Sequence, residues 1–354
     1  MNSEEPKTIS EFAYFHIFRY FFEERYYFCS LEVVLRKLRE YINWPSIRPD
    51  GLIRTRGDEF HRYCKVLGHS RLSKKLDEFK RDMDETSCAV VEKILKDYIK
   101  FRSQNRAKAE EWYDYAVLSN LRDIDKKINS IIAMGPIPKH ISPHSYPDIF
   151  CYESGLTFVP EEIVKRKITG KDILDCGAYF GDSAIVFHRM HKPKKIYSFE
   201  PEKANYARLL ETIEFCGIKN AIAVNMGVGE CKKIAGITPK AGGGSKIVNM
   251  GRGERTHITD IDSFVKKNGI VPGLIKMDIA GYELKALKGA LKTIKKYRPI
   301  LLIAIYYNPV NFFEIKPLLE KNLKGYRFLV RYIAYNHPTY ETPLIGYPLD
   351  EEAI

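Results

Sequence analysis

One stretch of the chain, residues 173–183, limits the fold more than any other. It reads Ile-Leu-Asp-Cys-Gly-Ala-Tyr-Phe-Gly-Asp-Ser, so an apolar run leads into Asp175, and Gly177 and Gly181 precede helix-compatible residues. This order is typical of a buried strand, a glycine turn and the start of a helix. The N–H groups at such a helix start bind nucleotide-like ligands. The stretch therefore predicts a binding turn for a nucleotide-like cofactor.

A second apolar stretch, residues 195–201, follows closely and ends on an acid. It reads Lys-Ile-Tyr-Ser-Phe-Glu-Pro, which places Glu200 at the end of a second buried strand. A carboxylate at this position can accept hydrogen bonds from both hydroxyls of a ribose. The glycines are spaced D-x-G-x-x-x-G and no G-x-G-x-x-G occurs, so a pyrophosphate-bearing dinucleotide is the poorer fit.

Strand and helix patterns alternate from about residue 150 onward. This alternation predicts a mainly parallel sheet with helices on both faces. Ligands of such sheets bind beyond the carboxyl ends of the strands. The strands are expected at 172–176, 195–199, 221–226, 274–278, 300–306, 326–331 and 343–347, and the helices at 182–191, 202–216, 260–267, 282–296 and 311–322.

The first part of the chain shows a different pattern. Apolar residues recur at three- and four-residue steps from residue 9 to about 134, which predicts an all-helical domain over 1–134. Four prolines and a glycine within 135–147 predict a linker over 135–149, followed by a second domain over 150–354. An aromatic-rich stretch at 12–28 suits a core or homo-oligomer contact helix, and a helix lying on a membrane surface is the alternative.

Composition indicates a globular protein, with 45% hydrophobic and 29% charged residues. No apolar run approaches the ~18 residues that a transmembrane helix needs. A secretory signal begins with basic residues followed by an apolar run, and residues 1–7 do not show this pattern. We therefore expect no secretory signal and a cytoplasmic location. The seven cysteines are scattered without a C-x-x-C pair, so neither a disulfide framework nor a metal site is expected.

The net charge of +12 is divided unequally, with +3 over residues 1–150 and +9 over residues 151–354. The excess comes from lysines scattered over expected helix faces, such as Lys285, Lys288 and Lys292. A solvated helix face and an attraction for an anionic partner both explain it. We recognise no RNA-binding module in the sequence, and no DNA partner is expected.

Three motifs together resemble a known enzyme family. They are 175–183 (D-x-G-x-x-x-G-D-S), 199–201 (F-E-P) and 274–290 (L-I-K-M-D-I-x-G-x-E-x-x-x-L-x-G-A). In this order and spacing, they resemble the FkbM-type methyltransferases over roughly residues 150–350. The resemblance implies a Rossmann-like class I methyltransferase sheet, preceded here by the all-helical segment, and S-adenosyl-L-methionine as the cofactor.

The resemblance also implies which residues bind the cofactor. The glycine turn would hold its amino-acid and ribose end, Glu200 its ribose hydroxyls, and the end of the third strand its adenine. The cofactor-binding residues expected on this basis are Asp175, Gly177, Tyr179, Gly181, Asp182, Ser183, Glu200, Met226 and Gly227.

The acceptor side would be formed by Lys276, Asp278 and Glu283, which are the expected catalytic residues. Asp278 could orient or deprotonate a hydroxyl, and Lys276 could lower the pKa of that hydroxyl or pair with an acid. Two departures from the family pattern lie on this side. Ala280 stands where the family usually has glutamate, and Tyr307 stands where it often has histidine.

The function expected from the resemblance is an S-adenosylmethionine-dependent O-methyltransferase acting on a hydroxyl. The acceptor would be a small molecule or a glycan, in particular a sugar of a glycan or glycolipid. Ala280 and Tyr307 motivate an alternative, a cofactor-binding regulatory or interaction protein with a degenerate acceptor site. RNA methylation, suggested only by the basic charge, ranks last.

Overall fold

The computed structural model describes residues 51–100, 121–143, 146–238, 246–248, 253–333 and 341–349. The aromatic-rich stretch at 12–28, with the oligomer contact predicted for it, lies outside these residues. In the described segments, none of the helices combines the length and the hydrophobicity that crossing a membrane requires.

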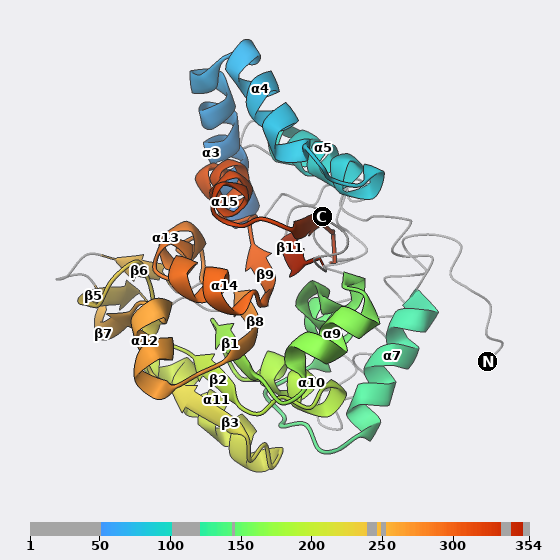
Figure 1. Ribbon diagram of the computed structural model, residues 1–354, viewed down its shortest axis with the longest axis vertical. Coiled ribbons are helices and arrows are strands. Elements are labelled where there is room, and N and C mark those ends of the chain that lie inside the picture. Colours follow the sequence, from blue (N-terminus) through green and yellow to red (C-terminus); the bar gives the residue numbers. More distant parts are fainter. Residues whose placement is uncertain are drawn as a thin grey trace, which may run out of the picture.

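A seven-stranded sheet forms the centre of the molecule (Figure 1). Its strand order is β10-β11-β9-β8-β1-β2-β3, and β11 alone runs antiparallel to its two neighbours. The strands are β1 (Asp172–Cys176), β2 (Ile196–Phe199), β3 (Ala221–Val224), β8 (Pro272–Met277), β9 (Ile300–Ala304), β10 (Tyr326–Val330) and β11 (Pro343–Pro348). The predicted fold class is confirmed, since each expected strand of this sheet is present.

Successive residues of a strand point to opposite faces of the sheet, and in the central strands both sets include apolar residues. In β1, Ile173 joins one buried cluster, whereas Leu174 and Cys176 join the other. Helices therefore cover both faces (Figure 1). On one face lie α7 (Leu121–Ala133), α8 (Pro147–Phe150), the 3-10 helix η3 (Glu153–Phe158), α9 (Glu161–Ile168), α10 (Asp182–Met190) and α11 (Lys203–Phe215); on the other lie α12 (Ile261–Asn268), α13 (Glu283–Lys288), α14 (Leu291–Tyr297) and α15 (Pro309–Asn322).

Two features differ from the expected elements. A second, four-stranded sheet of order β4-β7-β5-β6 follows β3 and was not predicted; it comprises β4 (Gly227–Val228), β5 (Lys233–Thr238), β6 (Lys246–Val248) and β7 (Glu254–Thr259). The helix expected at 282–296 is broken at Gly289 into α13 and α14. A Cβ atom on Gly289 would lie 2.4 Å from the carbonyl oxygen of Gly229, so the neighbouring backbone passes too close for a side chain. Asp262 then accepts hydrogen bonds from the first N–H groups of α14.

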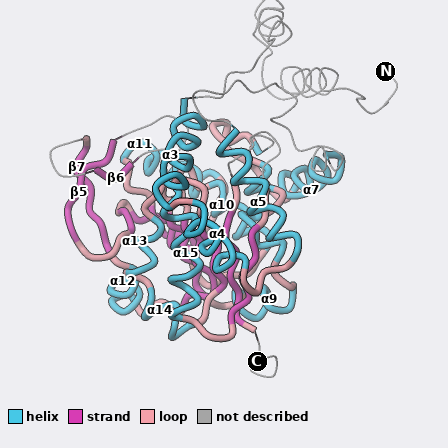
Figure 2. Tube along the Cα trace, turned by 90° about the horizontal axis from the view of Figure 1, so that it is seen from above, coloured by secondary structure: helices cyan, strands magenta, loops and turns pink. Residues whose placement is uncertain are grey.

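Of the N-terminal helices, α3 (Gly51–Leu67) and α4 (His69–Lys80) pack against α15, and α5 (Glu85–Lys100) packs against α3 and β10 (Figure 2). They share one buried cluster with the sheet: Phe79 stacks on Phe312 with ring centroids 5.1 Å apart, and Phe60 stacks on Tyr98 at 3.9 Å. The helical segment therefore covers α15 instead of standing apart from it.

The segment predicted as a linker also packs closely. Arg189 of α10 donates hydrogen bonds to the carbonyl oxygens of Ile131 and Pro136, and His140 contacts Thr212 of α11 at 2.9 Å. The division into domains over 1–134 and 150–354 with a linker over 135–149 stays a prediction. From these contacts we expect the three parts to unfold together.

The shared core predicts how a mutation in the helical segment affects stability. Phe79→Ala should lower the free energy of unfolding by about 3–5 kcal/mol, because it leaves a cavity against Phe312. Calorimetry should show one unfolding transition, shifted as a whole to lower temperature. Val66→Ala is the control, since Val66 of α3 is 84% exposed. A separate transition that Phe79→Ala does not move would mean that the helices and the sheet unfold independently.

Candidate functional site

A cavity lies at the carboxyl ends of β1, β2, β8 and β9, as expected for a sheet of this kind. Its wall mixes carboxylates and tyrosines with apolar residues. The polar and glycine residues that line it are Tyr146, Asp148, Ser154, Gly177, Tyr179, Asp182, Glu200, Asn205, Gly227, Lys276, Asp278, Tyr306, Tyr307 and Glu341.

The turn after β1 touches the end of β8. Gly177 has a φ of 85°, and a Cβ atom there would lie 1.9 Å from the carbonyl oxygen of Asp278. Asp278 in turn donates its N–H to the carbonyl of Cys176 at 3.0 Å. Only glycine fits this approach. The two strand ends thus form one continuous floor of the cavity.

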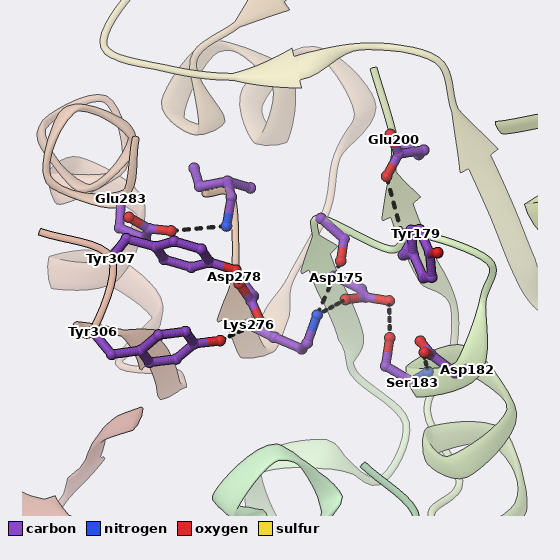
Figure 3. Close-up of polar contacts among 12 residues, drawn as sticks. Asp175, Tyr179, Asp182, Ser183, Glu200, Lys276, Asp278, Glu283, Tyr306 and Tyr307 are labelled. Carbon is purple, nitrogen blue, oxygen red and sulfur yellow. Dashed lines mark hydrogen bonds and ion pairs between the residues drawn. The ribbon is translucent and has the colours of Figure 1, made fainter. Parts of the chain in front are cut away.

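A buried ion pair lies beneath this floor (Figure 3). The Nζ atom of Lys276 is 3.0 Å from Oδ1 of Asp175 and 3.1 Å from the carbonyl oxygen of Gly177. Burial alone would lower the pKa of Lys276, but Asp175, Asp278 and Asp182 outweigh it and raise the pKa. Lys276 is therefore a permanent cation and not a proton acceptor.

Glu200 lies at the opposite end of the cavity, directly after β2. Its carboxylate accepts hydrogen bonds from the N–H groups of Tyr179 at 3.0 Å and Glu202 at 2.9 Å. Burial raises the pKa of Glu200 to about 7, although these N–H groups oppose the shift. A fixed carboxylate that titrates near neutrality therefore faces the cavity beside the β1 turn.

Asp278 is held by two tyrosines that follow β9. Tyr307 donates its hydroxyl to Oδ1 at 2.6 Å, and Tyr306 donates to Oδ2 at 3.0 Å (Figure 3). The Tyr306 hydroxyl also lies 3.0 Å from both carboxylate oxygens of Glu341. Burial, Asp278 and Glu341 raise the pKa of Tyr306 well above its usual value, so this tyrosine stays a donor.

Sequence reasoning missed one wall of the cavity, which comes from residues 146–154. Asp148, on α8, has its pKa raised to about 8 by burial and by the charges of Asp182 and Asp278. Ser154 lines the cavity from a turn in which it and Glu153 both have positive φ, 58° and 52°. Such backbone is uncommon outside glycine and often accompanies functional sites. The proline-rich sequence around them gave no signal for this placement.

Tyr306 and Tyr307 follow β9, and the sequence already placed Tyr307 on the acceptor side. Glu341, which precedes β11, was missed. Glu341 reaches the cavity because β11 inserts antiparallel between β9 and β10, and no local sequence pattern predicts that insertion.

The structure separates the twelve predicted residues into two groups. Eight of them line the cavity: Gly177, Tyr179, Asp182, Glu200, Met226, Gly227, Lys276 and Asp278. The other four, Asp175, Gly181, Ser183 and Glu283, are not among its lining residues. Asp175 is fully buried and accepts a hydrogen bond from the Ser183 hydroxyl at 2.6 Å, in addition to the Lys276 contact. Gly181, with a φ of 88°, is the residue directly before α10. The assignment of roles to all twelve stays a prediction.

Glu283 has contacts that suit a structural acid. It is fully buried, and its Oε1 accepts hydrogen bonds from the N–H groups of Ile279 at 2.8 Å and Gly281 at 3.2 Å. Its Oε2 accepts from the side chain of Asn311 on α15. Burial and Asp278 raise its pKa to about 8. Glu283 thus closes the turn after β8 and ties it to α15.

This role predicts the effect of two substitutions. Glu283→Ala should lower the free energy of unfolding by about 2–4 kcal/mol, since it leaves several buried donors without an acceptor. Glu283→Gln keeps an acceptor oxygen and should cost much less. Thermal unfolding at pH 7 measures both. An alanine variant as stable as the unmodified protein would show that these contacts do not hold the turn.

Residues 175–328 of the chain match the model of the methyltransferase FkbM domain. No curated protein matches the sequence. Among solved structures, the methyltransferase FkbM from Methylobacillus flagellatus KT is similar at 19% identity and a TM-score of 0.41, over 66% of this chain and 60% of that chain. This chain thus spans less than two thirds of that protein.

Two further solved structures are also similar. The rRNA methylase from Streptococcus thermophilus has 11% identity and a TM-score of 0.36 over 53% of this chain and 93% of its own. TYW2 from M. jannaschii, solved in complex with AdoMet, has 17% identity and a TM-score of 0.28 over 52% and 70%. The family match along the sequence is what decides the assignment.

The match covers both strand ends that form the floor of the cavity, with Gly177, Glu200 and Asp278. The expected family and its cofactor, S-adenosyl-L-methionine, are therefore confirmed. Over residues 175–328, which are less than half of its length, the chain matches the methyltransferase FkbM domain.

Proposed function

We propose that the protein transfers a methyl group from S-adenosylmethionine to a hydroxyl of a sugar-containing acceptor. One observation supports this most: a single cavity has Glu200 at one end, the Asp278–Tyr306–Tyr307 group at the other and the β1 turn between them (Figure 3). The cofactor and the acceptor can therefore bind next to each other in this cavity.

The residues of the first end fit the cofactor. The turn at Gly177 has no room for a Cβ atom, so the backbone itself forms this part of the wall. Glu200 would accept the ribose hydroxyls, and Met226 and Gly227 would lie against the adenine. Asp182, nine-tenths buried at the start of α10, has its pKa raised to about 6 by burial and would face the amino-acid end.

The second end fits a hydroxyl acceptor. When bound, S-adenosylmethionine supplies a methyl group on a positively charged sulfur. Asp278 accepts the proton that the acceptor hydroxyl loses while its oxygen forms the new bond to carbon. Lys276 cannot be this base, because the neighbouring carboxylates keep it protonated.

The tyrosines orient Asp278 but use only some of the hydrogen-bond acceptor positions of its carboxylate. A carboxylate has about four acceptor positions, and Tyr306 and Tyr307 use one on each oxygen. An acceptor hydroxyl can therefore still bind to Asp278. The other carboxylates on the wall, Asp148 and Glu341, suit an acceptor with several hydroxyls, as a sugar has.

A second function is favoured by one observation. The Tyr307 hydroxyl lies only 2.6 Å from Asp278, where the family often has histidine, and Ala280 lines the cavity in place of an acid. If these changes have removed turnover, the protein binds the cofactor in a regulatory or interaction role. The cytoplasmic location and a homo-oligomer stay predictions.

The proposed base can be tested by Asp278→Asn, which keeps the size of the side chain. Methyl transfer should fall about 100-fold or more, the scale of a lost general base, and cofactor affinity should hardly change. The assay incubates each protein with native cell extract and methyl-labelled cofactor and identifies the labelled product. Tyr307→Phe, which removes one hydrogen bond to the base, should lower transfer about tenfold, since it misplaces the base without removing it.

The identity of the product decides between the functions. A labelled sugar hydroxyl supports the proposal, labelled RNA would refute it, and no label despite cofactor binding would favour the binding protein. The assay is repeated with a chelator, because we expect the reaction to proceed without a metal. Activity lost with the chelator and restored by magnesium would contradict that expectation.

Cofactor affinity should depend on pH through Glu200. Its pKa of about 7 means that the binding form, the carboxylate, is lost as the pH falls below 7. Affinity should therefore be about tenfold weaker at pH 6 than at pH 8. Calorimetry of Glu200→Gln should show weaker binding at pH 8 and a smaller pH dependence. An unchanged affinity in this variant would exclude Glu200 from the ribose site.

A further inference from the structure

The acceptor end of the cavity is built on parts of the chain that the helical segment touches. Its wall carries Tyr306 and Tyr307 from the end of β9, and Ile333 and Glu341 from the two sides of the connection between β10 and β11. Helix α5 packs against β10 and contacts this wall at two separated points.

The first contact is made by Tyr98, near the end of α5. Tyr98 is fully buried, and its hydroxyl donates a hydrogen bond to the carbonyl oxygen of Tyr306 at 2.5 Å. Its ring lies flat on Phe60 at 3.9 Å, with an angle of 6° between the planes. The position of this hydroxyl is therefore set by two helices, α3 and α5.

The second contact lies at the start of α5. Arg331 donates hydrogen bonds to Asp84 at 3.1 Å and to the Ser87 hydroxyl at 2.7 Å, and Val330 donates its N–H to the same hydroxyl at 3.0 Å. The Arg331 guanidinium holds the pKa of Asp84 well below its usual range. This charged contact fixes the chain two residues before Ile333, on the same wall.

The carbonyl of Tyr306 belongs to the peptide that joins the two active-site tyrosines. Because a peptide is planar, a rotation of this carbonyl also turns the N–H of Tyr307 and changes the direction of its side chain. The Tyr307 hydroxyl lies 2.6 Å from Asp278, so a small rotation breaks that hydrogen bond. Tyr98 thus acts on Asp278 through the peptide and Tyr307.

We propose that Tyr98 is a positioning residue for the acceptor end, and that the helical segment fixes the geometry of Asp278 through it. The proposal rests on the proposed function in one respect, which is that this end of the cavity binds the acceptor. It gives the helices a role in the reaction, although none of the lining residues comes from the described part of α3, α4 or α5.

The test compares two substitutions of the same kind in the helical segment. Tyr98→Phe removes only the hydroxyl and keeps the ring on Phe60. Tyr63→Phe is the matched control, since Tyr63 of α3 stacks on Phe313 of α15 at 5.4 Å and is not among the residues that line the cavity. Each variant carries 3-fluorotyrosine at position 307, and fluorine NMR reports the surroundings of that ring.

Tyr98→Phe should shift or broaden the fluorine resonance, and Tyr63→Phe should leave it as in the unsubstituted protein. Labelled methyl transfer to cell extract should fall at least about tenfold for Tyr98→Phe alone, since misplaced groups cost this much or more. Affinity for S-adenosylmethionine should stay within about twofold in both variants, because the Glu200 end is untouched.

An unchanged resonance in Tyr98→Phe would overturn the proposal. So would equal changes in both variants, since these would indicate a general loosening of the helical layer. If the unsubstituted protein transfers no label, the proposed function fails, but the resonance still shows whether Tyr98 positions Tyr307. The two ideas can therefore fail separately.

Discussion

One buried ion pair, between Lys276 and Asp175, holds together the strands on which the site is built. The two residues stand opposite each other in adjacent strands β8 and β1. Asp175 also binds Ser183 of α10, and Lys276 binds the carbonyl of Gly177. Strand, turn and helix are thus joined at one point. Removing either charge would leave the other buried without its partner, which typically costs about 3–5 kcal/mol.

This pair explains how the chemistry is divided between neighbouring residues. Asp175 and Lys276 neutralise each other, and Asp175 is buried away from the cavity, whereas Gly177 and Asp278, two residues further along each strand, line it. The same logic applies at Glu283, whose hydrogen bonds are used to close a turn. Acids that look alike in the sequence therefore differ in their contacts because of their depth in the fold.

Most of the central sheet could be predicted from the sequence, because its strands are apolar runs that the helices must cover. The second sheet could not, because a strand such as β7 (Glu254–Thr259) is mostly polar and depends on its partners. Nor could the antiparallel position of β11 between β9 and β10 be foreseen. Asp148, Ser154 and Glu341 reach the cavity only through such tertiary placement. Glycine spacing and strand ends pointed to Gly177, Glu200 and Asp278, because local geometry already places those residues at the cavity.

The central claim is that one cavity binds the cofactor at Glu200 and presents its reactive sulfur to Asp278. A crystal structure with S-adenosylhomocysteine bound tests this claim most directly. The account predicts that the ribose hydroxyls are hydrogen-bonded to Glu200 and that the sulfur faces the end of the cavity formed by Asp278, Tyr306 and Tyr307. A ribose bound at Asp148, or a sulfur turned away from Asp278, would contradict it.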